Sequence, residues 1–320
     1  MEIIDIRHFA ARDFEPLLES ESAAWLTRLR WDYSSSSRAI AACLAEKRLS
    51  GYALLEGSRI RGYSFFVYEG EKGLIGGLFV EPGSAAKEWA LVLLEHIIET
   101  LKSSPGVRRV EAQLPHFAFQ DLEDCFRRHR FQGFLRRFMS LRLEGRPTVH
   151  GAEGDGARKA PFSIEPWQRK HDEGAARLLY LAYRNHVDAL INDQYCSLPG
   201  SSRLIENIVH LRGCGVSVPE ASLVAVDRTT QQLAGILALT TVRPLTAHVP
   251  QVAVASEFQR RGAGAGLMES AFRELDRLGF KEVSLTVTDQ NEDAVRFYDR
   301  LGFDTFCTFG AFVWNRGGGE

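Results

Sequence analysis

The clearest alternation of apolar and polar residues lies in the second half of the chain. Residues 252–254 read Val-Ala-Val and are predicted to end a buried strand. A helix is expected soon afterwards, because apolar residues recur there at helical spacing. These residues are Leu267, Ala271, Leu275 and Leu278. Apolar and polar residues then alternate over 282–287, which predicts a half-buried strand, and a second helix is expected after Asn291.

The first half of the chain shows a related order of elements. Gly57-Ser58 separates two apolar runs, which is a hairpin signal, and Asp227-Arg228 separates two more. The distance from Gly62 to Val80 is 18 residues, and that from Gly235 to Val254 is 19. A helix, a strand and a second helix are expected after each of these segments. We therefore predict a tandem duplication of one domain.

A glycine-rich linker separates the two halves. Residues 145–159 carry four glycines and almost no apolar residue. We place a first domain at 1–144, a linker at 145–162, a second domain at 163–315 and a disordered tail at 316–320.

Composition and charge narrow the class of protein. The chain has 320 residues, of which 45% are hydrophobic and 25% charged, as expected for globular domains. The net charge of −2 gives no reason to expect nucleic acid or a membrane surface as a partner. Charged residues occupy the N-terminus, where a signal peptide would need an apolar run.

The cysteines give no indication of a disulfide framework or of a metal. They are odd in number, far apart and without a Cys-x-x-Cys pair. They are Cys43, Cys125, Cys196, Cys214 and Cys307. We expect no metal site and a reducing, cytoplasmic location.

Glycines at every second position mark the start of the helix that follows residues 252–254. Gly262, Gly264 and Gly266 leave the first backbone N–H groups of that helix open to a ligand. The helix dipole favours an anion there, above all a phosphate. Arg260 and Arg261 add positive charge at the same place.

Three kinds of phosphate-binding loop have glycines spaced in a similar way. A nucleotide P-loop needs Gly-x-x-x-x-Gly-Lys-Ser/Thr, which does not occur. A dinucleotide fingerprint needs Gly-x-Gly-x-x-Gly directly after the strand. Here the third glycine position, 267, is leucine, and Gly262 lies seven residues beyond Ala255. The third pattern, Gln/Arg-x-x-Gly-x-Gly/Ala, is matched in full by residues 259–264. It resembles the GNAT superfamily of acyl-CoA-dependent N-acetyltransferases, where it holds the pyrophosphate of coenzyme A.

A second motif supports the resemblance. Residues 291–303 match Asn-x-x-Ala-x-x-Phe-Tyr-x-x-Leu-Gly-Phe, the other well-known GNAT signature, at the expected distance. The similarity is good over 220–312 and only general over the preceding 60 residues. It implies an α/β (α+β) mixed sheet flanked by helices, in two tandem GNAT domains, and acetyl-CoA as co-substrate.

The resemblance implies a role for each residue of the motifs. The predicted cofactor-binding residues are Val252, Ala253, Val254, Gln259, Arg260, Arg261, Gly262, Ala263, Gly264, Ala265 and Asn291. The Val252 N–H would stabilise the oxyanion, an effect of roughly 3 kcal/mol. Tyr298 would protonate the departing thiolate; a core aromatic is the alternative. Asn291 precedes a helix, so an N-cap and a cofactor contact both remain open.

The acceptor side is less defined. A helix is expected with one apolar face, formed by Ala175, Leu178, Leu179, Ala182 and Leu190, which also carries His186. By resemblance it borders the acceptor pocket, and the polar residues Asp188, Asn192 and Tyr195 are the candidates there. A solvated loop is the alternative for them. No glutamate occupies the strand as a base, so Asp188 or His248, acting through water, is left for that role.

The first half lacks each chemical feature of the second. With Val80 set against Val254, Gly262-Ala263-Gly264 fall on Glu88-Trp89-Ala90. Tyr298 falls on Phe126, which has no hydroxyl. We expect a degenerate first domain and one cofactor per chain, an arrangement similar to that of mycothiol synthase and its relatives.

The sequence thus predicts a transferase: an acetyl-CoA-dependent N-acetyltransferase acting on a primary amine by direct transfer in a ternary complex. The alternative is a non-catalytic acyl-CoA-binding sensor or interaction protein. The acceptor is expected to be a small molecule or a peptide, and its identity and the oligomeric state are left open.

Overall fold

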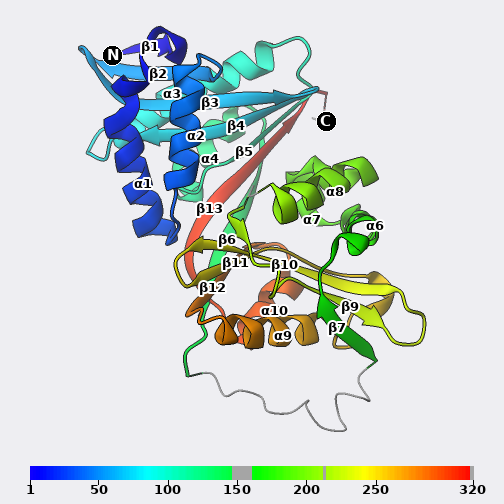
Figure 1. Ribbon diagram of the computed structural model, residues 1–320. Coiled ribbons are helices and arrows are strands. Elements are labelled where there is room, and N and C mark those ends of the chain that lie inside the picture. The colour runs from blue at the N-terminus through cyan, green and yellow to red at the C-terminus, as the bar shows by residue number, and fades with distance from the viewer. Residues whose placement is uncertain (146–160, 212–213, 318–320) are drawn as a thin grey trace. The chain divides into compact units, whose positions relative to one another are not determined.

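The computed structural model describes residues 1–145, 161–211 and 214–317. It divides into two compact units (Figure 1). Unit 1 comprises Met1–Arg137 and the C-terminal segment from Cys307, and unit 2 comprises Phe138–Phe306. Among the helices of the described ranges, none is both long and apolar enough to cross a bilayer.

Unit 1 is built on a mixed sheet in the order β1-β2-β3-β4-β5-β13. Its strands are β1 (Glu2–Asp5), β2 (Ser50–Glu56), β3 (Arg59–Glu69), β4 (Lys72–Val80), β5 (Arg109–Gln113) and the second part of β13 (Asp304–Asn315). Its helices are η1 (Ile6–His8), η2 (Ala11–Phe14), α1 (Glu15–Leu29), α2 (Ser34–Ala45), α3 (Ala86–Ser103) and α4 (Phe119–Arg128).

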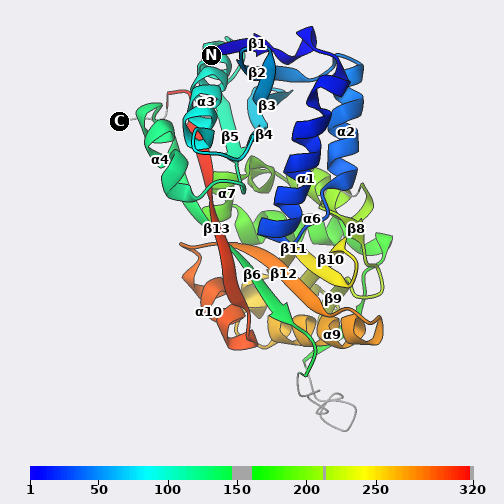
Figure 2. The same ribbon diagram turned by 90° about the vertical axis from the view of Figure 1, so that its left-hand side faces the viewer.

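Two apolar cores lie in unit 1. One contains the apolar stripe of α3, with Leu93, Ile97 and Leu101 fully buried, together with α4 and the inner strands. The other contains Phe14 and Leu17, with the buried side chains of α2. The helices α1 and α2 thus bury a different core from α3 and α4 (Figure 2).

Unit 2 repeats this plan with the strand order β6-β12-β11-β10-β9-β7, and β8 pairs with β10. Its strands are the end of β6 (Gln132–Arg142), β7 (Phe162–Pro166), β8 (Val216–Ser217), β9 (Leu223–Asp227), β10 (Leu233–Arg243), β11 (Thr246–Val254) and β12 (Glu282–Thr288). Its helices are η3 (Arg169–His171), α6 (Asp172–Tyr183), α7 (Val187–Ile191), η4 (Asp193–Cys196), α8 (Leu198–Ile205), η5 (Glu206–His210), η6 (Ser256–Phe258), α9 (Ala263–Arg277) and α10 (Glu292–Leu301).

The helices of unit 2 also bury two cores. The larger one contains Leu267, Ala271 and Leu275 of α9 against the inner strands, as the sequence predicts. The second contains the buried face of α6 and part of α8. The sheet of unit 2 is therefore covered on both faces. This explains why β12 is buried along most of its length rather than half-buried as predicted.

The strand registers confirm the internal repeat. Gly62 pairs with Val80, as Gly235 pairs with Val254. The parallel ladder of β4 with β5 has four register pairs, as has that of β11 with β12. Leu93 packs over Gly62, where a Cβ would lie 3.2 Å from its Cδ1, and Leu267 packs over Gly235, where the distance would be 3.0 Å.

The last strand of each half of the chain, β6 and β13, contributes to both units. The strand β6 begins in unit 1 and ends in unit 2, whereas β13 begins in unit 2 and ends in unit 1. In unit 1, Ala311–Asn315 of β13 pairs antiparallel with β5. In unit 2, the Leu143 N–H donates to the Lys281 carbonyl at 2.9 Å. The compact units therefore differ from the predicted domains, 1–144 and 163–315, because each unit contains part of β6 and part of β13.

Several predicted boundaries can be compared with the structure. Most of the predicted linker, 146–160, lies outside the described residues, as does 318–320 of the predicted tail. Arg316, predicted to begin a disordered tail, is instead ordered. Its guanidinium donates to the carbonyls of Val107, Lys102 and Ser104 at 2.7–3.0 Å.

The helix predicted to carry Leu190 and His186 on one face is in fact two helices. It ends at Tyr183, and His186 caps the next helix, α7, by accepting from the Asp188 N–H at 3.1 Å. Leu190 is consequently 51% exposed instead of buried.

Candidate functional site

The strands β11 and β12 separate in the middle of unit 2. Their parallel register runs from Thr246–Glu282 to Val249–Leu285, yet β11 continues to Val254 and β12 to Thr288. The separation coincides with a β-bulge. Between the pairs Thr240–His248 and Ala238–Gln251, β11 advances three residues while β10 advances two. Pro250 lies in this bulge and has no N–H to pair.

Beyond the bulge, β11 presents backbone groups at its open edge. The Ala255 N–H donates to the Ala234 carbonyl at 2.9 Å, so Ala255 and Ala253 direct their backbone groups toward β10. Val254 and Val252 alternate with them and point the other way. Consistently, the Val252 carbonyl accepts from the Tyr183 hydroxyl at 3.0 Å. The Val252 N–H shares that direction and faces the edge that β12 has left.

The start of α9 forms a glycine-rich loop of bare backbone, where the sequence predicts an anion. Gly262 is the N-cap with φ 92° and no side-chain cap, and the first helical bond runs from Gly266 N–H to its carbonyl at 2.9 Å. A Cβ at Gly262 would meet nothing within 4 Å. The amides of Gly262, Ala263, Gly264 and Ala265 precede the first helical bond, so they are available to a ligand.

The charged residues of the motif surround this loop. Arg260 also has positive φ (57°), and both it and Arg261 are exposed. The Arg261 guanidinium lies 5.5 Å from the ring centroid of Phe258, which holds it beside the helix start. The Gln259 amide donates to the Val254 carbonyl at 3.4 Å and so ties the loop to the open edge of β11. The predicted motif residues thus lie together at one place in unit 2.

Tyr298 lies on α10 and is 7% exposed. Its ring contacts Phe303 at 5.7 Å between centroids and Phe297 at 5.4 Å. Burial, with a contribution from the Asp188 carboxylate, raises the pKa of its hydroxyl above the ordinary value. The hydroxyl therefore stays protonated at neutral pH, as a general acid must. Both alternatives for Tyr298, a core aromatic and a proton donor, are compatible with this place.

Asn291 caps α10. Its side-chain oxygen accepts from the Ala294 N–H at 3.2 Å. The capping role that the sequence left open is therefore confirmed, and its contact with a cofactor stays a prediction.

A polar cluster that the sequence did not reveal lies against β11. The Gln251 amide donates to the Tyr183 hydroxyl at 3.0 Å, and the Tyr195 hydroxyl donates to the Gln251 oxygen at 2.8 Å. The Tyr183 and Tyr195 rings stack with centroids 4.4 Å apart. Of these three residues, only Tyr195 was predicted as a site residue. Gln251 could have been singled out as the one amide in an otherwise apolar stretch of strand.

The other acceptor candidates have different surroundings. The Thr288 hydroxyl, at the end of β12, donates to the Asp188 carboxylate, and His186 Nδ1 lies 3.4 Å from the same carboxylate. Asp188 is thereby placed next to the separated strands. Asn192 instead caps η4 by accepting from the Gln194 N–H at 3.0 Å, which accounts for its side chain by local structure.

His248 is fully enclosed on the other side of the bulge. Its Nδ1 lies 3.0 Å from the Ser284 hydroxyl, and its ring centroid lies 5.5 Å from that of Phe138. Burial lowers the pKa of its imidazole to about 3. A group with this pKa is a weak base near neutral pH, so His248 fits the predicted role of base poorly.

The equivalent helix start in unit 1 has no bare backbone. Because Leu93 and Leu267 occupy equivalent places, Glu88 corresponds to Gly262, as the sequence comparison predicts. Glu88 lies inside α3, which begins at Ala86, whereas Gly262 precedes α9. An additional piece of helix therefore replaces the glycine loop.

Side chains complete this replacement in unit 1. The Arg61 guanidinium lies 5.7 Å from the Trp89 ring centroid and is paired with Glu81. The counterpart of Tyr298 is Phe126, because the Phe131 N–H donates to the Phe126 carbonyl as the Phe303 N–H donates to that of Tyr298, each at 3.0 Å. Phe126 is fully buried and stacks on Phe312 at 3.9 Å.

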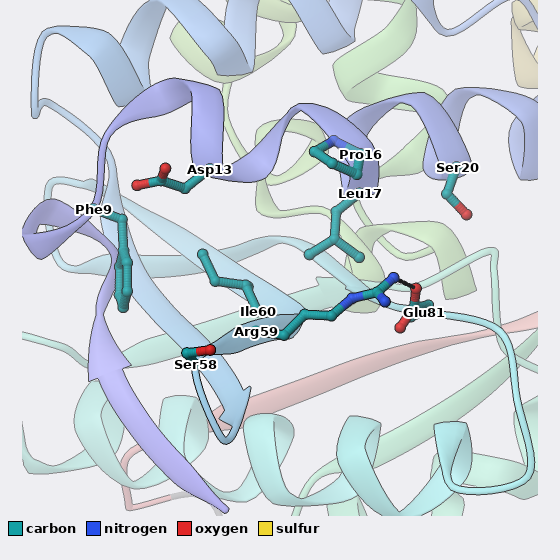
Figure 3. Close-up of a pocket in the computed structure, with 9 residues that line it drawn as sticks. All are labelled: Phe9, Asp13, Pro16, Leu17, Ser20, Ser58, Arg59, Ile60 and Glu81. Carbon is teal, nitrogen blue, oxygen red and sulfur yellow. Dashed lines mark hydrogen bonds and ion pairs between the residues drawn. The ribbon is translucent and has the colours of Figure 1, made fainter.

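A pocket of about 520 Å³ lies in unit 1, at a different place (Figure 3). It opens between α1 and the β2–β3 turn, with Leu17 and Ile60 among its apolar lining. The Arg59–Glu81 ion pair borders it. Its lining residues all belong to unit 1, whereas all residues predicted from the motifs belong to unit 2.

Comparison with protein families gives one match. A model of the acetyltransferase (GNAT) family matches residues 188–303, which include the separated strands, the glycine loop and α10. A comparison with curated protein sequences finds no match.

Solved structures are similar over most or all of the chain. A tandem GNAT protein from the clavulanic acid biosynthesis pathway is 15% identical, with 100% of this chain and 99% of that chain covered and a TM-score of 0.59. A GCN5-related N-acetyltransferase from Sphaerobacter thermophilus is 16% identical over 88% and 87% of the two chains, with a TM-score of 0.58.

A third similar structure is part of a larger protein. The glucosamine N-acetyltransferase region of a fungal multi-domain β-N-acetylglucosaminidase is 16% identical, with a TM-score of 0.65 over 98% of this chain and 38% of that one. At these identities the similarity concerns the fold. The chain thus has the fold of a tandem GNAT protein, and residues 188–303 of its second unit match the model of the acetyltransferase (GNAT) family.

Proposed function

We propose that unit 2 is an acetyl-CoA-dependent N-acetyltransferase that acts on a primary amine. The observation that carries the proposal is the combination of the open edge of β11 with the glycine loop of α9. The edge offers backbone groups of Val252 and Val254 to an extended chain, and the loop offers amides to a pyrophosphate. Coenzyme A contains both groups, since its extended pantetheine chain is joined to a pyrophosphate.

In the proposed reaction the acetyl group passes directly from acetyl-CoA to the amine, among the groups around the separated strands. The amine nitrogen attacks the thioester carbonyl, the new C–N bond forms, and the C–S bond breaks. The Val252 N–H stabilises the negative charge on the carbonyl oxygen, and Tyr298 gives a proton to the departing thiolate. The amine loses one proton, so the products are the amide and the free thiol of coenzyme A.

Asp188 is the base that the structure favours for the amine. It lies next to the end of β12 through its hydrogen bond from Thr288, whereas His248 is enclosed and weakly basic. We propose that the amine enters beside Asp188 and the Tyr183–Gln251–Tyr195 cluster. Stacked tyrosines and an amide suit an uncharged or monocationic amine with an apolar part.

Turnover tests the proposal. The full chain is mixed with acetyl-CoA and a panel of polyamines, amino acids, aminoglycosides and peptides with free N-termini. Release of the coenzyme A thiol is then followed. We expect release that depends on one class of amine. Binding of acetyl-CoA without release for any amine would favour the non-catalytic sensor instead.

A matched pair of substitutions tests the glycine loop. Gly262→Glu places a carboxylate at the amides proposed to hold pyrophosphate, and we expect it to abolish coenzyme A binding in calorimetry. Gly262→Gln has the same size and the same strain at positive φ without the charge. It should retain part of the affinity. Similar affinity for the wild type and both variants would place the pyrophosphate elsewhere.

A further inference from the structure

Three side chains of the types that bind metals meet in unit 1, whereas the candidate acyl-CoA site belongs to unit 2. They are Glu95 on α3, Cys125 on α4 and His129 directly after α4, and their ligand atoms all lie within 4.8 Å of one another. The Cys125 thiol donates to Glu95 Oε2 at 3.0 Å, and His129 Nε2 lies 3.0 Å from Glu95 Oε1. The helices α3 and α4 lie side by side there (Figure 2).

We propose that Glu95, Cys125 and His129 form a site for a divalent transition metal, with Zn²⁺ as the ion that fits the ligand set. Thiolate, imidazole and carboxylate are the three ligand types of zinc in proteins, and the fourth position would hold water. A tetrahedral ion with bonds of about 2.0–2.3 Å separates its ligand atoms by roughly 3.3–3.7 Å. The observed spacing needs only small side-chain rotations to reach this.

The local structure favours an ion in two ways. Cys125 and His129 are four residues apart at the end of one helix, so both side chains project from the same face. His129 Nε2 is buried, and its approach to Glu95 lacks the direction of a hydrogen bond, which leaves a buried nitrogen unsatisfied. Coordination would satisfy this atom.

Charge and exposure also suit a bound cation. On binding, the thiol proton passes to solvent, and the thiolate and the Glu95 carboxylate together balance the two charges of the ion. The Cys125 side chain is buried, whereas the side chain of Glu95 is 37% exposed, so an entry path exists. The Arg128 guanidinium lies 3.4 Å from Glu95 Oε2 and competes with the ion for that oxygen.

Unit 2 shows that the fold does not require these residues. By the equivalences given above, Cys125 corresponds to Phe297 and His129 to Leu301, both apolar, while Glu95 corresponds to the exposed Glu269. Apolar residues thus fill two of the three positions in the other unit. The polar set of unit 1 therefore needs a reason of its own, and a metal site that fixes α4 to α3 supplies one. The inference is independent of the proposed acetyltransferase activity.

Titration of the full chain with Co²⁺ tests the proposal, because a thiolate ligand gives a near-ultraviolet charge-transfer band. We expect one Co²⁺ per chain, displaced by Zn²⁺, and a higher thermal unfolding midpoint with Zn²⁺. Cys125→Ser should abolish the band. His129→Leu, which copies unit 2, should weaken binding at least about tenfold.

Two further variants separate coordination from an adventitious thiol adduct. Arg128→Gln removes the competitor for Glu95 and should tighten Co²⁺ binding, since a positive charge is lost beside the ion. Glu269→Gln is the matched control on α9 and should change nothing. A band that persists in Cys125→Ser, unchanged affinity in His129→Leu, or no band in the wild type would overturn the proposal.

Discussion

At the scale of single residues, the two units place related aromatic side chains at the same position of the fold. Tyr298 in unit 2 and Phe126 in unit 1 both bury an aromatic ring against the phenylalanine that follows their helix, Phe303 and Phe131 respectively. The ring therefore satisfies packing in both units, and the hydroxyl is the only addition in unit 2. Packing therefore accounts for the ring, and the proposed proton transfer concerns the hydroxyl alone.

Replacement of Tyr298 by phenylalanine tests this reading. Tyr298→Phe keeps the ring, so the fold and the Michaelis constant for acetyl-CoA should change little, whereas kcat should fall by up to about 10² for loss of a general acid. Steady-state kinetics over a range of pH measures both parameters. Equal kcat in the two proteins at every pH would identify Tyr298 as a core residue only.

A second residue of interest is the buried acid Glu21 in unit 1. It is 3% exposed and accepts a hydrogen bond from the Tyr63 hydroxyl, and burial raises the pKa of its carboxyl from 4.5 to about 7. His116 lies 3.9 Å away, and burial lowers the pKa of its imidazole to about 4. Between these values both groups are neutral, which suits a buried pair.

The shift at Glu21 predicts how stability depends on pH. A carboxyl whose pKa is raised on folding stabilises the native state below pH 4.5, and this stability is lost as the pH rises through 7. In Glu21→Gln the loss disappears, so the variant should gain about 3 kcal/mol relative to the wild type between pH 4 and 8. Urea unfolding of both proteins, with His116 present in each, measures the difference. Parallel stability curves would contradict the shift.

At the scale of elements, features set by local sequence patterns could be predicted, whereas contacts between residues far apart in the chain could not. The matching order of elements in the two halves and the start of a helix at the glycines of 262–266 are predicted from local patterns and are confirmed. The Tyr195–Gln251 hydrogen bond joins residues 56 positions apart, and no periodicity encodes it. The break after Tyr183 was missed because apolar residues continue at helical spacing through it.

The strand β6 passes from unit 1 into unit 2, and β13 passes back from unit 2 into unit 1. This exchange of last strands could not be predicted, for a different reason. The two strands are the last of their halves and fill equivalent edges, each partly buried and partly exposed. Exchanging them preserves the inward and outward pattern at both edges, so the amphipathic pattern of the sequence is the same for either connection.

The exchange predicts how fragments of the chain behave. The fragment 163–320 lacks Met139, Leu141 and Leu143, which belong to the main core of unit 2, and its segment 307–315 lacks its partner β5. We expect it to be poorly soluble or inactive. The fragment 138–306 contains all of unit 2 and should be the better behaved of the two. Purified yield, circular dichroism and thiol release compare them, and full activity of 163–320 would contradict the expectation.

At the scale of the whole molecule, a duplicated fold carries one complete set of site residues. Unit 1 repeats the parallel ladder and the bulge, with register pairs Phe66–Ile75 and Phe65–Gly77. In unit 1, however, the first turn of α3, with Trp89, occupies the place of the glycine loop. The counterpart of Tyr298 there is Phe126, which has no hydroxyl. Fold similarity alone would suggest two cofactor sites, and the residues support one.

Stoichiometry tests this conclusion. Calorimetric titration of the full chain with coenzyme A should give one site per chain, and the Gly262→Glu variant should give none, because unit 1 has no free loop of amides to replace it. A stoichiometry of two in the wild type, or one remaining site in the variant, would show that unit 1 binds the cofactor as well.

The exchange of β13 also has a consequence for synthesis. A ribosome releases the chain from its N-terminus, and unit 1 receives its last strand, Cys307–Asn315, only after all of unit 2 has emerged. Until then β5 is an unpaired edge beside an apolar core, which favours pairing with other nascent chains. Unit 2 has all of its strands by Phe306, so the unit that is translated second completes its sheet first.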